Sequence, residues 1–289
     1  MSEPCRVSVV VATYNRADVL RDNLRSVLDQ DVDAYEAIYV DDGSTDAAPQ
    51  VLEEARAAHA GRLRVLRVEN RGQGLARNAG VSEARGAYLL FTDDDVTVPR
   101  DWISRMLAAY QARGCDALCG GFVPHSMETR VERYLHYRMQ IGFGEKPKAV
   151  RVAPMMNFLV PRAVFDETGG FVAEPIEDWV LCRELLNRGR TIFYDPSVAV
   201  THRYQTRWED AVRRVRSPAI LGMNDRLDTG RSGLAYMTHT TAKFLASPLW
   251  SLKHYPPDLY FLSLRMEWLF WRTRLAAYLA SLAGKRLSV

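Results

Sequence analysis

The chain has 289 residues, of which 47% are hydrophobic and 25% are charged, a composition that excludes a disordered or fibrous protein and fits one large domain with an appendage. Its net charge of +3 is unevenly spread: residues 203–289 carry 14 Lys or Arg and 6 Asp or Glu, a net +8, and the remainder carries a net −5. An acidic body with a basic C-terminal region predicts two functional regions.

The four cysteines, at positions 5, 115, 119 and 182, have no spacing that completes a zinc site, so we expect reduced thiols. The first residues lead directly into a strand-like segment, without a cationic leader and a cleavable apolar stretch. The chain also has no run of about 20 uninterrupted apolar residues. These features predict a cytoplasmic protein without a signal peptide or a membrane span.

The first half of the chain alternates strand-like and helix-like segments, the pattern of βαβ units in a mainly parallel sheet with helices on its faces. Strands are expected at residues 7–11, 37–40, 63–68 and 87–92, with helices between them, the third over residues 73–84. Asn15 is expected to cap the first helix, and Ser44 or Thr45 the second.

The second half is less regular. Pro99 suits the first turn of a helix over residues 101–113, and a loop or lid is expected around Gly142, Gly144 and Pro147. Strands are expected at residues 117–122, 157–160, 191–194 and 197–201, helices at 161–168 and 177–188, and a mostly helical region after residue 203.

Two of the expected strands end in carboxylates. Asp41 and Asp42 follow the second strand, and Asp93, Asp94 and Asp95 follow the fourth. Ligands of open α/β sheets bind outside the carboxyl ends of the strands, so we expect both acidic ends to face one crevice. The triplet is either a solvated acidic turn or a site for a divalent cation, which relieves the repulsion of the charges and holds a diphosphate.

Five segments match one known family in their order along the chain. They are VSVVVATYNR (7–16), YVDDGSTD (39–46), NRGQGLARN (70–78), FTDDD (91–95) and GGFVAEPIEDWVL (169–181). Over roughly residues 6–205 the chain resembles the inverting family 2 glycosyltransferases of the GT-A fold. The resemblance implies a metal-dependent transfer of a sugar from a nucleotide diphosphate donor, with UDP expected first, to a hydroxyl acceptor.

The resemblance also implies the fold class and the domains. We expect a Rossmann-like α/β fold, with a mainly parallel central sheet flanked by helices, over residues 1–205. Its nucleotide-binding half covers about 1–98 and its acceptor half about 99–205, and a helical extension follows at 206–289. Two alternatives stay open: a metal-dependent nucleotidyltransferase of related fold and a non-catalytic scaffold.

By the same resemblance the triplet is a DxD motif. Asp95 is the expected ligand of Mn²⁺ or Mg²⁺, and Asp93 meets the ribose or a metal-bound water. Asp94 reaches the donor sugar or is solvated. His202 follows a strand-like run at a position where members of this fold place a metal-ligating histidine, and imidazole suits Mn²⁺ better than Mg²⁺.

The nucleotide is expected at the ends of the first two strands. Asp42 is implied to contact the base, with Ala12, Thr13 and Tyr14 lining the same pocket. Arg77 is expected to hold the acidic cluster or the nucleotide, the alternative being a surface ion pair. Arg77 also stands where a dinucleotide fingerprint needs glycine, which argues against a nicotinamide cofactor.

Glu177 and Asp178 open a helix, where acids also suit the helix dipole. The resemblance makes Asp178 the general base, because an inverting transfer needs a base that deprotonates the acceptor hydroxyl opposite the leaving group. Glu177 is expected to orient the acceptor or its loop, and Trp179 to stack on a sugar or to belong to the core.

The C-terminal region lies beyond the resemblance. Basic residues cluster at positions 203, 207, 213, 214 and 216, and residues 264–274 mix arginine with aromatic residues as an interfacial helix does. We expect either a helical subdomain packed on the catalytic body or peripheral contact with the inner face of a membrane. No nucleic-acid-binding motif is present, so no nucleic-acid partner is expected.

Overall fold

The computed structural model describes residues 6–173, 176–209, 211–212, 216, 219, 232–283 and 285. The chain divides into two compact units, Met1–His125 with Glu145–Arg203, and Ser126–Gly144 with Tyr204–Val289. The expected division after residue 205 did not anticipate that residues 126–144 group with the C-terminal unit. Of the cysteines, Cys115, Cys119 and Cys182 are buried and free, and Cys5 lies outside the described residues.

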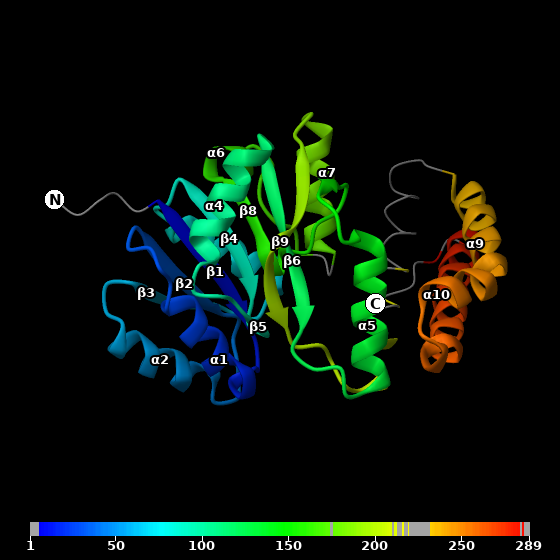
Figure 1. Cartoon of the computed structure of the whole chain (residues 1–289), viewed down its shortest axis with the longest axis horizontal. Coiled ribbons are helices and arrows are strands. Elements are labelled where there is room, and N and C mark those ends of the chain that lie inside the picture. Colours follow the sequence, from blue (N-terminus) through cyan, green and yellow to red (C-terminus); the bar gives the residue numbers. More distant parts are fainter. Residues whose placement is uncertain are drawn as a thin grey trace. The chain divides into compact units, whose positions relative to one another are not determined.

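A nine-stranded sheet forms the centre of the first unit (Figure 1), in the order β3-β2-β1-β4-β8-β6-β9-β5, with β7 paired to β9. Its strands are β1 (Val7–Thr13), β2 (Tyr35–Asp41), β3 (Leu63–Arg67), β4 (Tyr88–Asp93), β5 (Val96–Thr97), β6 (Ala117–Pro124), β7 (Lys148–Ala149), β8 (Phe158–Pro161) and β9 (Ile192–His202). Parallel pairs join β1 to β4 and β2, β2 to β3, and β6 to β9, and the other pairs are antiparallel.

The parallel strands are the most deeply buried part of the unit. Every residue of β1 and β2 is buried, in agreement with the near-continuous apolar runs that strands covered on both faces require. The helices of this unit are α1 (Ala17–Leu28), α2 (Ala48–Ala58), α3 (Gln73–Glu83), α4 (Trp102–Arg113), α6 (Arg162–Asp166) and α7 (Glu177–Asn187), with a 3-10 turn at Met155–Asn157.

The expected helix caps are wrong. Arg16 stands at the N-cap of α1, and the Asn15 side chain instead accepts hydrogen bonds from the backbone N–H groups of Thr45 and Asp46. For α2, Asp46 rather than Ser44 accepts from the backbone of the first turn, at 2.9 Å from the N–H of residue 48. Asn15 and Asp46 therefore tie together the loops that follow β1 and β2, a tertiary demand that local capping rules do not contain.

The expected loop around Gly142, Gly144 and Pro147 is wrong at Gly142, because residues 130–143 form a helix, α5 (Arg130–Phe143), and it holds for residues 144–147. Thr129 and Glu132 form a capping box at its start: the Thr129 hydroxyl accepts from the Glu132 N–H at 3.1 Å, and the Glu132 carboxylate accepts from the Thr129 N–H at 2.8 Å. The Thr-x-x-Glu signal was present in the sequence, and the helix ends at Gly144.

The segments expected as two short strands before His202 form the single strand β9. The register against β6 shifts between Gly120 and Gly121, where β9 bulges around Pro196, which has no N–H for the ladder. The Asn157 amide donates to the carbonyls of Gly121 and Val198 at 2.9 Å each and closes the bulge. β9 thereby continues to His202, which pairs with Val96 of β5.

The second unit is helical in its described residues. Besides α5 it contains α9 (Gly233–His254), a 3-10 turn (Pro257–Leu259) and α10 (Tyr260–Leu282), and α9 lies beside α10 (Figure 1). Its core includes Tyr134, Leu135, Tyr255, Leu259, Met266 and Leu269. None of the helices in the described residues is long and apolar enough to cross a membrane. The expected basic cluster lies partly outside the described residues, at Arg213 and Arg214.

Candidate active site

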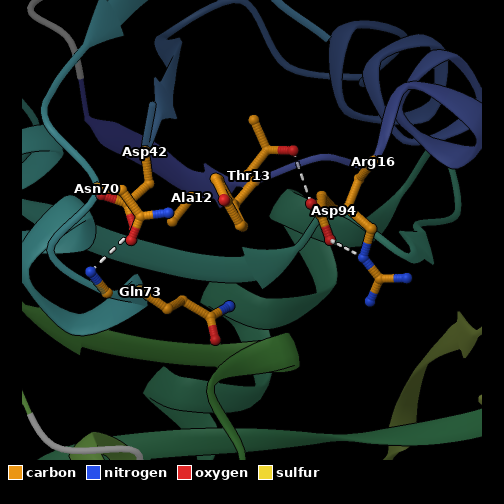
Figure 2. Close-up of a pocket in the computed structure, with 9 residues that line it drawn as sticks. Ala12, Thr13, Arg16, Asp42, Asn70, Gln73 and Asp94 are labelled. Atoms are coloured by element: carbon orange, nitrogen blue, oxygen red, sulfur yellow. Dashed lines mark hydrogen bonds and ion pairs between the residues drawn. The ribbon is translucent and has the colours of Figure 1, made fainter. Parts of the chain in front are cut away.

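A pocket opens at the carboxyl ends of β1, β2 and β4 (Figure 2). The strands end level with one another, because Thr13 pairs with Asp41 and Ala12 pairs with Asp93 in register. The pocket is lined by Ala12, Thr13, Tyr14, Arg16, Asp42, Asn70, Gly72, Gln73 and Asp94. The two acidic strand ends therefore face one crevice, as expected from the sequence.

Asp42 holds one wall of this pocket. Its two carboxylate oxygens accept hydrogen bonds from the backbone N–H groups of Arg71 (3.0 Å) and Gly72 (2.9 Å). Asp41, one residue earlier, points elsewhere and accepts from the Ser44 N–H at 2.9 Å. Tyr14 keeps 46% of its surface exposed at the pocket, so its ring is available to a flat ligand. Asp42 thus shapes the loop and retains lone pairs that face the pocket.

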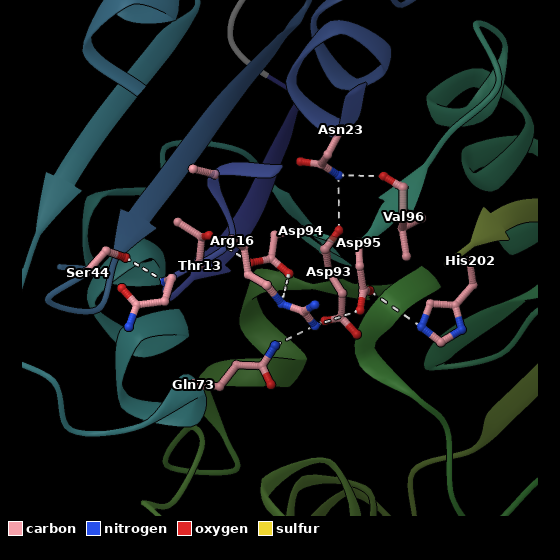
Figure 3. Close-up of polar contacts among 12 residues, drawn as sticks. Thr13, Arg16, Asn23, Ser44, Gln73, Asp93, Asp94, Asp95, Val96 and His202 are labelled. Atoms are coloured by element: carbon pink, nitrogen blue, oxygen red, sulfur yellow. Dashed lines mark hydrogen bonds and ion pairs between the residues drawn. The ribbon is translucent and has the colours of Figure 1, made fainter. Parts of the chain in front are cut away.

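The side chains of the acidic triplet point in three directions (Figure 3). Asp94 is only 6% exposed and accepts from the Thr13 hydroxyl at 2.7 Å, with the Arg16 guanidinium 3.8 Å from its other oxygen. Burial, followed by the charge of Asp95, raises the pKa of Asp94 to about 7. Because Asp94 and Asp95 are both buried, the alternative of a solvated acidic turn is wrong for them.

Asp95 lies between two cationic or potentially cationic groups. One oxygen is 2.9 Å from the Arg16 guanidinium, and the other is 3.4 Å from Nε2 of His202, which is 2% exposed. The pairing of β5 with the end of β9 makes this meeting possible, since it places His202 opposite Val96. The structure therefore brings together Asp95 and His202, two of the three residues expected around the metal, whereas Asp93 lies apart from them.

The turn that carries the triplet is clamped by Asn23 of α1, which sequence reasoning missed. The Asn23 amide donates to the carbonyls of Asp93 (3.0 Å) and Val96 (2.7 Å), one at each end of the turn (Figure 3). Its own carbonyl accepts from the hydroxyl of Tyr39 at 2.6 Å, deep in the sheet. The signal in the sequence was a polar residue, Asn23, at a position within the apolar face of the expected helix.

Asp93 faces away from Asp95, toward α3 and α7. It accepts from Arg77 at 2.7 Å and from the Gln73 amide at 3.2 Å. Arg77 is 2% exposed, and its other terminal nitrogen donates to Glu177 at 2.9 Å. The alternative of a surface ion pair for Arg77 is therefore wrong, and Arg77 does not line the pocket in which Thr13 and Asp42 lie. One buried guanidinium joins the end of β4 to the start of α7.

Asp178 follows Glu177 in the first turn of α7 and keeps partial exposure to solvent. Burial, followed by the charge of Glu177, raises the pKa of Asp178 to about 6, while Arg77 and the backbone N–H of Trp179 lower it. Trp179 is half-buried, and the guanidinium of Arg183 lies 5.0 Å from its ring centre. The carboxylate of Asp178 is therefore more basic than that of an ordinary aspartate.

Asp95 and His202 fit a divalent cation through the chemistry of their donors. A carboxylate oxygen and an imidazole nitrogen suit Mn²⁺, and such ions often take few protein ligands and fill the remaining positions with substrate phosphate and water. The described residues contain no group of three or more His, Cys, Asp or Glu that could hold a metal ion. Arg16 was also missed as a site residue, and its guanidinium forms ion pairs with the carboxylates of Asp94 and Asp95.

The sheet and the acidic turn after β4 define the class of the protein as a GT-A type α/β fold. The mannosyltransferase PcManGT from Pyrobaculum calidifontis, solved with GDP-Man and Mn²⁺, shares this fold with a TM-score of 0.63 and 20% identity, over 99% of this chain and 77% of that one. A structure of S. aureus TarS 1-349 with UDP-GlcNAc gives a TM-score of 0.57 and 18% identity, over 97% and 92% of the two chains.

The family follows from the sequence. The model of glycosyl transferase family 2 matches residues 8–169, more than half of the chain, and the protein therefore belongs to this family. Glycosyltransferase AglE of Haloferax volcanii is 30% identical over 171 residues, which cover 57% of this chain and 55% of AglE. The pre-mycofactocin glycosyltransferase of Mycobacterium tuberculosis is 28% identical over 221 residues, 72% of this chain and 45% of that protein. The chain spans about half the length of these relatives.

Proposed function

We propose that the protein is a metal-dependent inverting glycosyltransferase that moves a sugar from a nucleotide diphosphate sugar to a hydroxyl acceptor. The observation that carries the proposal is the buried Arg77, which joins Asp93 at the donor side to Glu177, next to Asp178. A nucleotidyltransferase has no need for the acidic start of α7, and family 2 membership supports sugar transfer.

On the donor side, the nucleotide occupies the pocket at the ends of β1 and β2. Tyr14 flanks the base, Asp42 contacts it, and Ala12 and Thr13 form the floor. Asp94 lines the pocket toward the sugar. The structures of relatives with UDP, UDP-GlcNAc and GDP-Man support a nucleotide sugar, and UDP is the donor base we expect first.

Asp95 and His202 would hold Mn²⁺ or Mg²⁺. Asp93 faces away from this pair, toward Arg77 and Gln73, so it would meet the ribose rather than a metal-bound water. A bound cation would neutralise the negative charge that develops on the departing diphosphate. The Mn²⁺ in the PcManGT structure supports a divalent cation as the cofactor. Arg16 contacts the other oxygen of the Asp95 carboxylate, so it can keep this ion pair while the oxygen near His202 binds the cation.

Asp178 acts as the general base. Its carboxylate accepts the proton of the acceptor hydroxyl, the freed oxygen attacks the anomeric carbon, and the bond to the diphosphate breaks with inversion. Glu177, held by Arg77, orients the loop, and Trp179 lies on the acceptor side. The acceptor is a saccharide, a lipid-linked compound or a small molecule, and peripheral membrane contact through the C-terminal unit belongs to the same proposal.

The Asp178→Asn variant tests the mechanism. We expect nucleoside diphosphate release to fall by about 100-fold or more, because a general base is lost, while metal-dependent donor binding is retained. A panel of UDP-, GDP- and dTDP-sugars with Mn²⁺ or Mg²⁺, scored by thermal stabilisation, identifies the donor first. Asp29→Asn, the same change at an exposed helix end, is the control and should keep full activity. Full activity in Asp178→Asn would refute the assigned base.

A further inference from the structure

Most of the residues that the helices α9 and α10 bury are small or polar. Residues that are buried on α9 are Gly233, Met237, Thr240, Ser247 and Ser251, and on α10 they are Ser263, Met266, Leu269, Thr273 and Ala277. The hydroxyls of Thr240, Ser263 and Thr273 donate to carbonyls of their own helices, at 2.6 to 3.1 Å. Small residues and internally satisfied hydroxyls let the two helices approach each other closely.

The large apolar side chains of the two helices point outward instead. Twelve large hydrophobic residues are exposed in the described part of the chain, and nine of them lie on α9 and α10. They are Leu234, Leu245, Leu249, Trp250, Leu252, Phe261, Trp268, Leu279 and Leu282, between 39% and 80% exposed. Met237, Met266 and Leu269 are buried, but most of the large apolar surface of the two helices faces outward, and a contiguous exposed apolar face of this kind marks a site for an apolar phase or partner.

The charges on the same outer face are of one sign. The exposed charged residues of α9 and α10 are Lys243, Lys253, Arg265 and Arg272, and their one acidic residue, Glu267, is partly buried. Arg272 lies over the ring of Trp268 at 4.8 Å, a pair with an apolar body and a charged tip. Leucine, tryptophan and basic residues without exposed acids are the composition of helices that lie in the surface of an anionic bilayer.

We propose that the outer face of α9 and α10 docks on the surface of a lipid bilayer that contains anionic headgroups. The helices lie in the interface rather than cross it, in agreement with the absence of a spanning helix among the described residues. A second copy of the chain is a poorer occupant, because a symmetric contact would set lysines and arginines against each other. This inference deepens the membrane contact proposed above by naming its face and lipid class.

Vesicle co-sedimentation of the full-length chain tests the inference without donor or acceptor, so its outcome is independent of the transfer reaction. We expect the protein to bind vesicles of about 70% phosphatidylcholine and about 30% phosphatidylglycerol at least about tenfold more tightly than pure phosphatidylcholine vesicles. Leu245→Glu/Leu249→Glu should weaken binding to the anionic vesicles by about tenfold or more. Both leucines are more than 70% exposed, so the variant should remain folded, as checked by circular dichroism.

Ala108→Glu/Ala112→Glu is the matched control, since it adds two glutamates at the same spacing to an exposed helix face of the first unit. It should bind anionic vesicles as the parent does. The inference fails if the parent protein stays in the supernatant, or if the leucine variant sediments equally well. It also fails if the parent is a dimer, the leucine variant is a monomer and neither protein binds vesicles. The face would then be an interface between two copies of the chain.

Discussion

Arg77 shows how much of the site depends on one buried side chain. Its two terminal nitrogens donate to carboxylates that stand 16 residues later and 100 residues later in the chain. The aromatic ring of Phe171 lies 5.5 Å from its guanidinium and restricts its movement. The planar fork of arginine can serve both carboxylates at once, whereas a lysine ammonium is a single point of charge. Arg77 therefore fixes Asp93 at the end of β4 relative to Glu177 at the start of α7.

Arg77→Gln should lower the free energy of unfolding by about 3 kcal/mol, because two poorly solvated carboxylates lose their cation. Arg77→Lys should be more stable than Arg77→Gln, because it keeps the positive charge, but its ammonium cannot contact both Asp93 and Glu177. Urea unfolding of the three proteins measures the effect. Arg56→Gln, which removes an exposed ion pair with Glu53 on α2, serves as the control and should leave stability unchanged. Equal stability of Arg77→Gln and the parent would contradict the buried bridge.

Asp94 makes a second prediction at the residue scale, for the dependence of stability on pH. Its pKa of about 7 in the fold exceeds the ordinary value of 3.8, so the folded state keeps a proton that the unfolded state releases. The contribution of Asp94 to the free energy of unfolding is fully present below about pH 4 and is lost as the pH rises toward and through 7. The loss amounts to at most about 4 kcal/mol, at about 1.4 kcal/mol per pKa unit.

Asp94→Asn cannot ionise and should escape this loss. The free energy of unfolding of the variant relative to the parent should therefore increase from pH 5 to pH 8, as measured by urea unfolding at both values. Because the other titrating groups contribute to both proteins, the difference isolates position 94. A difference that stays constant with pH would show that the buried carboxyl is not protonated in the fold.

At the scale of elements, the close contact of α3 with the start of α7 depends on a glycine. A Cβ atom at Gly74 would lie 2.3 Å from the carbonyl oxygen of Val172 and 3.0 Å from Cβ of Glu177. Backbone atoms cannot move aside as the tip of a flexible side chain can. The absence of a side chain at this position therefore lets the helix that carries Arg77 approach the helix that carries Glu177.

Gly74→Ala should destabilise the protein by about 1–3 kcal/mol, although alanine is the better helix former by about 1 kcal/mol. It should also lower turnover, since α7 must move. Gly142→Ala is the matched control: it is a helical glycine with open space at its Cβ position, so it should raise stability by up to about 1 kcal/mol. Thermal unfolding compares the two, and a stabilised Gly74→Ala would contradict the close contact.

Most elements of the first unit were predictable, because their periodicity is local. The strands β1 to β4 and the helix α3 lie where alternation and helical spacing indicate them. Residues 130–143 were missed because the glycines and the proline near their end outweighed the capping box at their start. The extent of β9 was missed because a local reading stops at Pro196, whereas Asn157 bridges the bulge from another segment.

For the whole molecule, a bound cation and nucleotide should stabilise the fold, because a ligand that binds only the folded state adds about 2.7 kcal/mol at 100 times its dissociation constant. Mn²⁺ with a nucleoside diphosphate should raise the melting temperature, and a chelator should remove the metal-dependent part. Asp95→Asn should lose that part as well, whereas Asp29→Asn keeps it. A rise in melting temperature that survives Asp95→Asn would place the cation elsewhere.

The sequence by itself determined the α/β class, the order of the elements from β1 to β4 and the placement of carboxylates at the ends of two strands, because each depends on local periodicity and on the direction of parallel strands. Only the tertiary structure decided which groups meet. It set His202 beside Asp95, Arg77 between Asp93 and Glu177, and the leucines of α9 on the outer face. The first two contacts join residues that are distant in the chain, and the third depends on which face of the helix is buried. Packing, rather than local propensity, determines such features.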